Sequence, residues 1–233
     1  MDIDDLHIGD LVFLLIIGIF WLWMANLTPN ESFIPENDPM CQYPYKNMGL
    51  RGSTNLAICS GIPISLYVLL YIISKNNPSY SYILPFDLIE AIVFHLGSIF
   101  FAGIINHYLK LKVGRPRPDF YEFTQKIKDS HIRKEEMIKE SFKSFPSGHS
   151  CTASSSCCFL SIFLCKIINV SSYLGVALKL TPMFYSIYIG CMRITEHRHH
   201  IDDVLAGLFI GILVSVLMIF GGYRSIFTQS LKP

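Results

Sequence analysis

Six long apolar stretches are the feature that most constrains how this chain can fold. They cover residues 11–25, 56–73, 91–105, 153–168, 174–192 and 204–220. A helix needs about 20 mostly apolar residues to cross the hydrocarbon core of a membrane, and with its flanks each stretch reaches or approaches that length. Hydrophobic residues make up 51% of the 233 positions, which is more than soluble proteins usually carry. The sequence therefore predicts an all-α fold, a six-span transmembrane helical bundle.

The composition also argues against several other classes of protein. Acidic residues surround the start of the first stretch, where a signal peptide would need positive charge, so we expect a membrane span there. Of the seven cysteines only Cys41 lies clearly in a loop, and the sequence predicts small buried side chains rather than a disulfide framework. The net charge of +1 says nothing about nucleic acid, but no basic stripe interleaved with aromatics is present, so we expect no nucleic acid as a partner. The apolar stretches predict membrane lipids as partners.

A first polar island, KLKVGRPRPDF at residues 110–120, follows the third apolar stretch. It places Lys110 and Arg117 seven residues apart, and its two prolines hold the backbone extended. Taken alone, such a basic cluster beside a span is more typical of an anchor for lipid headgroups than of a catalytic site.

A second island, FPSGHS at residues 145–150, opens the fourth stretch. Proline, serine and glycine directly before an apolar span predict a helix start, where free backbone N–H groups and the helix dipole favour an anion. Ser147 and Gly148 would form this anion pocket. His149 would then lie on the first turn beside it, which makes the histidine a candidate proton donor.

The third island, CMRITEHRHHIDDVLAG at residues 191–207, joins the fifth and sixth stretches. Arg193 ends the fifth stretch, while His199 and Asp203 are four residues apart and would share one helix face. A carboxylate that accepts a hydrogen bond from Nδ1–H fixes the imidazole tautomer and leaves Nε2 free as a nucleophile or base. His200 and Asp202 could form a second such pair, so spacing alone leaves the choice open.

The same island raises the alternative of a metal site. It holds five residues of ligating types: His197, His199, His200, Asp202 and Asp203. The adjacent His199 and His200 would point about 100° apart on a helix, so they would not converge on one ion. We therefore expect no metal here.

Read in order, the three islands resemble the lipid phosphate phosphatase family, the membrane branch of the type 2 phosphatidic acid phosphatase superfamily that also includes vanadium haloperoxidases. The family signature is KxxxxxxRP, then PSGH, then SRxxxxxHxxxD, and its register selects His199 over His200. Met192 stands where the family usually has serine, which we expect to tune activity without abolishing it. The matching positions are Lys110 with Arg117 and Pro118, then Pro146 to His149, then Arg193, His199 and Asp203.

This resemblance implies one structural domain in three regions. Residues 1–84 hold the first two spans, residues 85–222 form the phosphatidic acid phosphatase type 2 catalytic region, and residues 223–233 form a short polar tail.

The resemblance also implies a phosphatase that needs no metal or other cofactor. His199 would attack phosphorus and form a phosphohistidine, Asp203 would orient its ring, and His149 would act as the acid and then the base. The phosphate oxygens would be bound by three cations and by backbone at a helix start, which are Lys110, Arg117, Arg193, Ser147 and Gly148.

Several lipid phosphates are substrates of this family, and the sequence selects none of them. They are phosphatidate, lysophosphatidate, sphingosine 1-phosphate, diacylglycerol pyrophosphate and polyprenyl pyrophosphates. A transferase on the same scaffold, as in sphingolipid synthases, is an alternative, and a non-enzymatic relative is another. Neither the organelle nor the oligomeric state is evident from the sequence.

The side of the membrane on which the site lies is indicated in two conflicting ways. The family places it outside the cell or in a lumen, in an endomembrane or at the plasma membrane, and we expect the same here. Yet 14 of the 19 Lys and Arg residues lie on the site's side, which by the positive-inside tendency indicates a cytosolic site. Glycosylation sequons at Asn30 and Asn169 fall on opposite sides and can decide the question.

Two further polar features receive structural interpretations. The charged segment 122–143 predicts a solvated helix near the membrane surface more than a substrate lid. Asp87, Glu90 and His95 lie within or at the start of the third span, far from its catalytic end, and we expect hydrogen bonds that pack helices.

Overall fold

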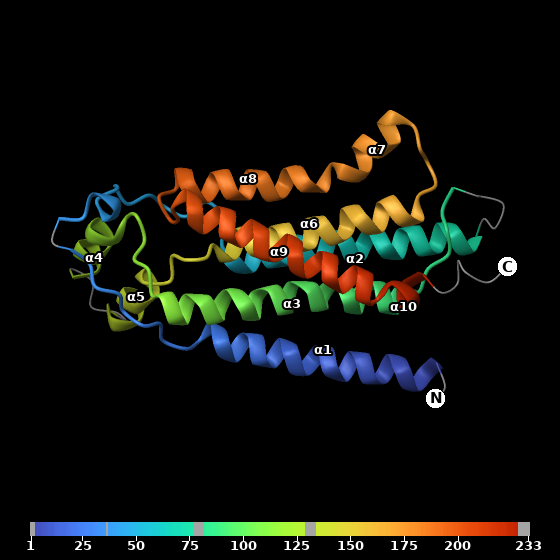
Figure 1. The fold of residues 1–233 in the computed structure, drawn as a ribbon, viewed down its shortest axis with the longest axis horizontal. Coiled ribbons are helices and arrows are strands. Elements are labelled where there is room, and N and C mark those ends of the chain that lie inside the picture. The colour runs from blue at the N-terminus through green and yellow to red at the C-terminus, as the bar shows by residue number, and fades with distance from the viewer. Residues whose placement is uncertain (1–2, 36, 77–81, 129–133, 228–233) are drawn as a thin grey trace.

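The computed structural model describes residues 3–35, 37–76, 82–128 and 134–227, and over these residues the fold is helical without strands (Figure 1). One isolated antiparallel bridge joins Ile83 to Ile168. The elements in chain order are α1 (Ile3–Ala25), the short 3₁₀ helix η1 (Pro39–Cys41), α2 (Gly52–Asn76), α3 (Leu88–Val113), α4 (Phe120–Lys128), α5 (Lys134–Ser141), α6 (Gly148–Ile167), α7 (Tyr173–Leu180), α8 (Pro182–Thr195), α9 (Ile201–Gly221) and α10 (Tyr223–Phe227).

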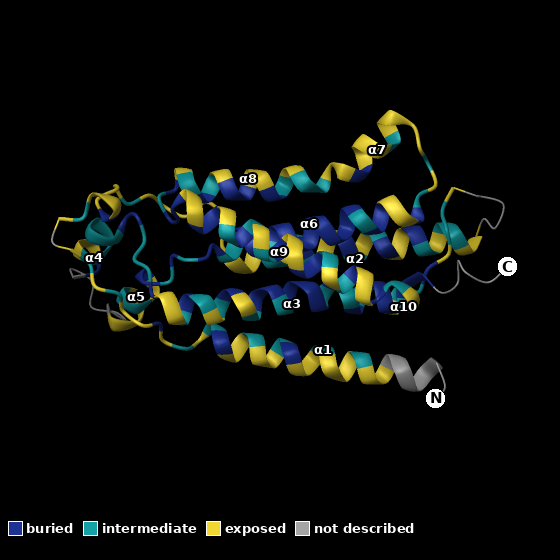
Figure 2. Cartoon of the chain, in the orientation of Figure 1, coloured by how far each residue is buried: buried dark blue, intermediate teal, exposed yellow. Residues whose placement is uncertain are grey.

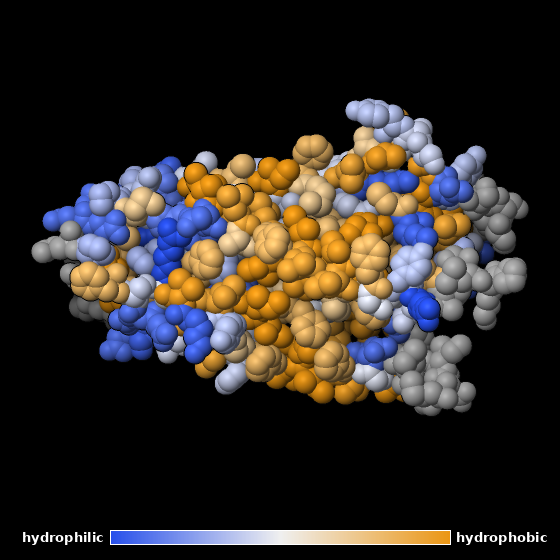
Figure 3. Space-filling model, viewed as in Figure 1, coloured by the Kyte–Doolittle hydropathy of each residue, from blue (hydrophilic) through white to orange (hydrophobic). Residues whose placement is uncertain are grey.

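The predicted six-span bundle is confirmed, with one span built differently from the others. Within the described ranges, α1, α2, α3, α6 and α9 are each long and apolar enough to cross a membrane. The remaining span, the fifth in chain order, consists of α7 and α8, which meet at an angle of 40°. Pro182 explains the break, because proline lacks the N–H that a continuous helix needs and restricts the residue before it. On the face seen in Figure 3, apolar side chains cover the middle of the molecule, with polar surface toward both ends.

Helix α6 is the centre of the bundle, and nearly its whole length is buried (Figure 2). It packs against α2, α3, α8 and α9, and its pairing with α9 is the most extensive in the molecule. Two glycines of α9 make this pairing close: a Cβ at Gly207 would collide with the carbonyl oxygen of Ser147, and one at Gly211 would collide with that of Cys151. Small residues four apart are a common means of close helix packing in membranes. The contact holds the starts of α6 and α9 together, where two of the polar islands lie.

Helix α1 lies at the rim and packs along α3. Trp21 stacks on Phe100 with ring centroids 5.5 Å apart, and it also lies directly against Gly103, where no other side chain would fit. Most other large side chains of α1 are exposed, as expected for a helix that faces lipid.

The two ends of the bundle are formed by different elements. Helix α1 begins and α10 ends at one end, while α4, α5 and the loop that follows α1 lie at the other (Figure 1). The expected tail at 223–233 is not wholly polar: Tyr223–Phe227 form α10, and Ile226 and Phe227 are buried in the core, while residues 228–233 lie outside the described residues. The apolar spacing of Tyr223, Ile226 and Phe227 explains this correction.

Of the three polar residues expected to make helix-packing hydrogen bonds, His95 makes them and Asp87 instead caps its own helix. His95 is fully buried, its Nε2–H donates to the Cys59 carbonyl at 3.0 Å, and its Nδ1 accepts from the Tyr67 hydroxyl at 2.8 Å. Asp87 caps the start of α3 by accepting from the Glu90 N–H at 3.0 Å.

Two other structural predictions need correction. All seven cysteines are free, but Cys165 and Cys191 are exposed rather than buried, because they lie on outward-facing sides of α6 and α8. The segment 122–143 forms two short helices, α4 and α5, rather than one, with residues 129–133 outside the described residues.

Candidate active site

The three polar islands converge on one cavity. It lies at the end of the bundle where α4 and α5 lie, which is called the site end below. The cavity has a volume of about 550 Å³. Six of the predicted site residues line it, and they come from α3, the segment after it, α6, α8 and the loop before α9: Lys110, Arg117, Gly148, His149, Arg193 and His199. Residues far apart in the sequence therefore surround one space that is large enough for a phosphate and part of its lipid.

His199 lies in the loop before α9, not on the helix as its spacing from Asp203 indicated. Helix α9 begins at Ile201 with His200 as its N-cap. The Nδ1–H of His199 donates to the Ser144 carbonyl at 2.8 Å, while Nδ1 is 3.8 Å from Oδ2 of Asp203. Because Nδ1 carries the proton, Nε2 keeps its lone pair. Of the two histidines that spacing left open, His199 lines the cavity and His200 caps the helix.

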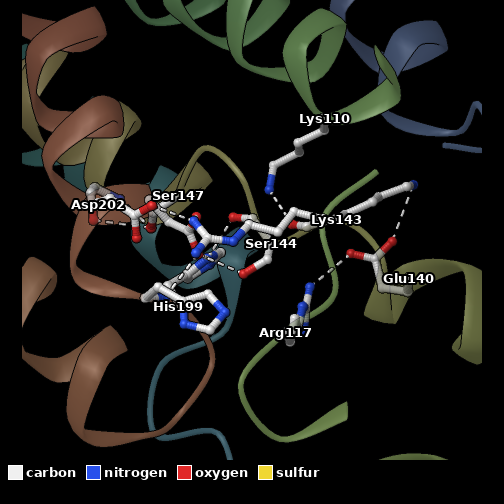
Figure 4. A network of polar contacts seen from close by, with 12 residues as sticks. Lys110, Arg117, Glu140, Lys143, Ser144, Ser147, His199 and Asp202 are labelled. Atoms are coloured by element: carbon white, nitrogen blue, oxygen red, sulfur yellow. Dashed lines mark hydrogen bonds and ion pairs between the residues drawn. The ribbon is translucent and has the colours of Figure 1, made fainter. Parts of the chain in front are cut away.

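Asp203 lies beside the Nδ1 edge of the His199 ring and is completely buried. Its Oδ2 accepts from the Ser144 hydroxyl at 2.6 Å and from the His200 N–H at 2.8 Å. Its Oδ1 accepts from Arg115 at 2.8 Å, and Arg115 also pairs with the exposed Asp202 at 2.5 Å (Figure 4). Sequence reasoning missed Ser144 and Arg115, although Arg115 lies within the quoted basic island.

The electrostatic environment keeps the imidazole of His199 neutral. Burial lowers its pKa well below the ordinary histidine value, because the charged form loses hydration. The Asp203 carboxylate opposes this shift, while the nearby cations Lys110, Arg117 and Arg193 add to it. A neutral ring with a free Nε2 is the form that can act as a nucleophile.

The three cations of the cavity are each held by a partner. Lys110 lies in the last turns of α3, still within the helix, and its Nζ donates to the Lys143 carbonyl at 2.5 Å. Arg193 is buried and pairs with Glu196 at 2.6 Å, and Arg117 pairs with Glu140 at 3.2 Å. In both arginines the Nε–H is buried without a hydrogen-bond partner. Each of these arginines therefore keeps one donor that no protein group satisfies, even though the positive charges are partly compensated.

Two acidic residues of the site were missed by sequence reasoning. Glu140 lies between Arg117 and Lys143, which it contacts at 3.2 and 3.1 Å, and it lines the cavity (Figure 4). Glu196 also accepts from the Gly49 N–H at 2.7 Å and so joins the first loop to the end of α8. Its position three residues after Arg193 on a helix was an available signal. Glu140 had no local signal, because only the folding of α5 over the cavity brings it there.

The start of α6 is the predicted helix terminus, with one change in its donors. Ser147 is the N-cap and Gly148 the first helical residue. The N–H of Ser147 donates to the Asp203 carbonyl at 2.9 Å, so it is not a free donor for an anion, whereas Gly148 lines the cavity. The Nε2–H of His149 donates to the Leu50 carbonyl at 3.2 Å, which tethers this ring at the cavity wall.

Arg198, a neighbour of the histidines, has a structural role. It is buried, pairs with the buried Asp119 at 3.2 Å and lies over the rings of Tyr45 and Phe123. These contacts join the first loop, α4 and the loop before α9 above the cavity. Within the described ranges, no three His, Cys, Asp or Glu side chains come together as a metal site would require.

Comparisons with known proteins show which family and which relatives the chain is similar to. The PAP2 superfamily profile matches residues 91–225, more than half of the chain. Lipid phosphate phosphatase 2 of Arabidopsis thaliana is 28% identical over 224 residues, which cover 90% of this chain and 74% of that protein. Phospholipid phosphatase 1 of Rattus norvegicus is 24% identical over 235 residues, which cover 90% of this chain and 82% of that protein.

A third relative matches a shorter part of the chain. A protein of Schizosaccharomyces pombe, named Probable diacylglycerol pyrophosphate phosphatase 1, is 31% identical over 148 residues, which cover 57% of this chain and 52% of that protein. No solved structure matches the chain significantly.

Proposed function

The chain belongs to the PAP2 superfamily, and on that basis we propose that it is an integral membrane lipid phosphate phosphatase. One observation carries this proposal: His199, with its Nδ1–H bound to the Ser144 carbonyl, lines the same cavity as Lys110, Arg117 and Arg193. The cavity lies at the ends of membrane-spanning helices. A headgroup at the interface can enter it while the acyl chains stay in lipid.

The reaction that this geometry supports has two steps. In the first, Nε2 of His199 attacks the phosphorus, an N–P bond forms, the bond from phosphorus to the lipid oxygen breaks, and His149 gives a proton to the departing oxygen. In the second, water attacks the phosphorus, His149 takes its proton, and the N–P bond breaks to release phosphate. Asp203 and the Ser144 carbonyl hold the ring and stabilise its positive charge while it is phosphorylated.

Phosphoryl transfer also requires that the negative charge on the phosphoryl oxygens be stabilised at a fixed position, and the three cations can do this. The open Nε–H groups of Arg117 and Arg193 and the positive start of α6 can bind equatorial oxygens. We infer that turnover needs no divalent ion, so phosphate release should survive EDTA. Activity that disappears with EDTA and returns with a divalent ion would contradict this.

Phosphate release from a panel of lipid phosphates in detergent micelles tests the function directly. The panel contains phosphatidate, lysophosphatidate, sphingosine 1-phosphate, diacylglycerol pyrophosphate and a polyprenyl pyrophosphate, with EDTA present. His199→Ala should remove turnover and leave membrane insertion intact. His197→Ala is the matched control, since His197 is two residues away, binds the Pro44 carbonyl and does not line the cavity.

The outcomes separate the proposal from its alternatives. An unchanged rate in His199→Ala would refute the mechanism. Phosphorylated product that appears only when a lipid alcohol is added would indicate a transferase in place of a phosphatase.

The membrane orientation is part of the same proposal, with the site on the lumenal or extracellular side. Many basic side chains at this end have acidic partners, including Arg117 with Glu140 and Arg198 with Asp119. Their structural use weakens the positive-inside argument for a cytosolic site. Asn30 and Asn169 are both exposed, and sugar on Asn30 would support the proposal, whereas sugar on Asn169 would refute it.

A further inference from the structure

Asn106 is a buried polar residue of the cavity that the catalytic scheme does not use. It lies on α3, its exposed fraction is 1%, and it lines the cavity. Neither its amide nitrogen nor its amide oxygen has a hydrogen-bond partner. A buried amide without partners is costly, so its presence needs a reason outside the packing of the bundle.

Asn55, on the opposite wall of the same cavity, shows what a structural asparagine looks like here. Its amide nitrogen donates to the His149 carbonyl at 3.2 Å, and its oxygen accepts from the Tyr185 hydroxyl at 2.9 Å. It thereby ties α2 and α8 to the start of α6. Asn106 makes no such connection, so its buried carboxamide is left without a protein partner at the wall of a cavity that a polar group could enter.

The position of Asn106 defines which part of a lipid it can meet. It precedes Lys110 by four residues on α3, so it lies about 6 Å deeper in the membrane on the same helix face. Its Oδ1 is 3.5 Å from where a Cβ of Gly148 would be, and Lys110 Cε is 3.7 Å from that point. Lys110 and Asn106 therefore both reach the start of α6, Lys110 from nearer the end of α3 and Asn106 from one turn before it.

We propose that Asn106 selects the substrate class by hydrogen-bonding the polar linker that joins phosphate to the acyl chains. This inference rests on the proposed function. In glycerol-based and sphingoid lipid phosphates, ester, hydroxyl or amino groups lie within a few bonds of the phosphate and can pair with the carboxamide. In alkyl and polyprenyl phosphates only hydrocarbon reaches this depth. The Asn106 amide then stays without a partner, and the lipid is bound less well.

The test compares one substrate that has this polar linker with one that lacks it, and reads the change in their ratio on substitution. Phosphate release from dioleoyl phosphatidate and from oleyl monophosphate is measured in the same micelles for the full-length chain and for Asn106→Leu, which keeps the size of the side chain and removes its polarity. For phosphatidate, kcat/KM should fall about tenfold, equivalent to about 1.4 kcal/mol. For oleyl monophosphate it should stay the same or rise, so the preference for phosphatidate collapses.

Two additional measurements exclude a structural explanation. Asn106→Leu should melt at the same or a higher temperature than the parent protein, because it removes an unpaired buried amide. Ser161→Ala is the matched control. Ser161 is also buried without a partner, but it lies near the other end of α6 and does not line this cavity. The ratio of kcat/KM for the two substrates should therefore be the same in Ser161→Ala as in the parent protein.

The outcomes are distinguishable from failure of the proposed function. Equal losses on both substrates, or an unchanged ratio in an active Asn106→Leu, would overturn the role of Asn106 and leave the phosphatase in place. A parent protein that releases phosphate from neither lipid would overturn both proposals.

Discussion

Two buried histidines, His95 in the middle of the bundle and His199 at its site end, have similar burial and opposite uses. Both ring nitrogens of His95 are hydrogen-bonded, one to the Tyr67 hydroxyl and one to the Cys59 carbonyl. Only Nδ1 of His199 is bound, and the ring lines a cavity. Burial alone therefore does not distinguish a structural histidine from one that we propose as catalytic. The difference between these two is a ring nitrogen without a partner at a cavity.

The same contrast extends to the surroundings of the two residues. In the middle of the bundle, buried polar side chains pair across helices, as Ser155 does with Ser98 and Ser156 with the Cys59 carbonyl. At the site end, buried donors of Arg117, Arg193 and Asn106 have no partner. Unpaired buried groups lower stability. They also occur away from the cavity, at Ser161 and Arg198, but three of the residues that carry them line this one cavity, which indicates that it is built for binding.

The largest expected effect comes from breaking the support of His199. Asp203→Asn removes the charge that stabilises the phosphorylated ring and places an amide where the Ser144 hydroxyl and the His200 N–H both donate. We expect kcat to fall by about 10²- to 10⁴-fold, comparable to loss of the carboxylate that orients a histidine in hydrolases of the Ser-His-Asp type. Steady-state phosphate release on solubilised protein measures the change.

Asp202→Asn is the matched control for this variant. Asp202 is the neighbouring residue, it also contacts Arg115, and its side chain is 62% exposed. We expect less than about a threefold change, because exposed ion pairs contribute little. Equal losses in the two variants would mean that Arg115, and not the orientation of His199, accounts for the effect.

The extent to which these two regions could be predicted from sequence differs as well. Spans and motif residues follow from apolar length and from three short patterns, because both are encoded locally. The partners Ser144, Glu140 and Glu196 were missed, since folding of loops and short helices brings them to the cavity.

The exact start of α9 and the unpaired Asn106 at the cavity were also missed, although signals for both existed. Asp203 is the third residue of α9, where a carboxylate can cap the start of a helix. This position fits a helix that begins at Ile201, directly after His200. Asn106 is one turn before Lys110 within an apolar span, where a polar residue is costly unless it has a use.

A smaller effect on activity should come from Glu140, which neutralises Arg117 at the cavity. Glu140→Gln removes the carboxylate that competes with a phosphate for Arg117 and Lys143. We expect KM for a lipid phosphate to fall by up to about fivefold with little change in kcat, since a partly exposed ion pair is worth up to about 1 kcal/mol. Glu135→Gln, an exposed change on the same helix, should leave KM unaltered. A rise in KM for Glu140→Gln would show instead that Glu140 positions Arg117.

A still smaller effect is expected when the pH is lowered. The nucleophile must be neutral. For an ordinary histidine with a pKa near 6.5, the neutral fraction would fall about tenfold when the pH is lowered to 5.5. Because burial holds the pKa of His199 well below that value, the ring stays neutral and protonates only at lower pH. From pH 7 to 5.5 we expect kcat/KM to change less than about twofold, after correction for the second ionisation of the substrate phosphate near 6. A tenfold loss across this range would contradict a neutral, buried His199.

The smallest effect on activity is expected at His95, where the comparison predicts a loss of stability instead. His95→Leu leaves the Tyr67 hydroxyl and the Cys59 carbonyl without their partner inside the bundle, which costs about 1 to 3 kcal/mol. The melting temperature in detergent should fall, while kcat measured well below it stays within about twofold of the parent value, because His95 does not line the cavity. His199→Leu is the reciprocal variant and should abolish turnover without lowering the melting temperature by as much. If His95→Leu lost turnover while keeping its melting temperature, the mid-bundle histidine would be part of the chemistry, and the division between a packed middle and an open site end would be wrong.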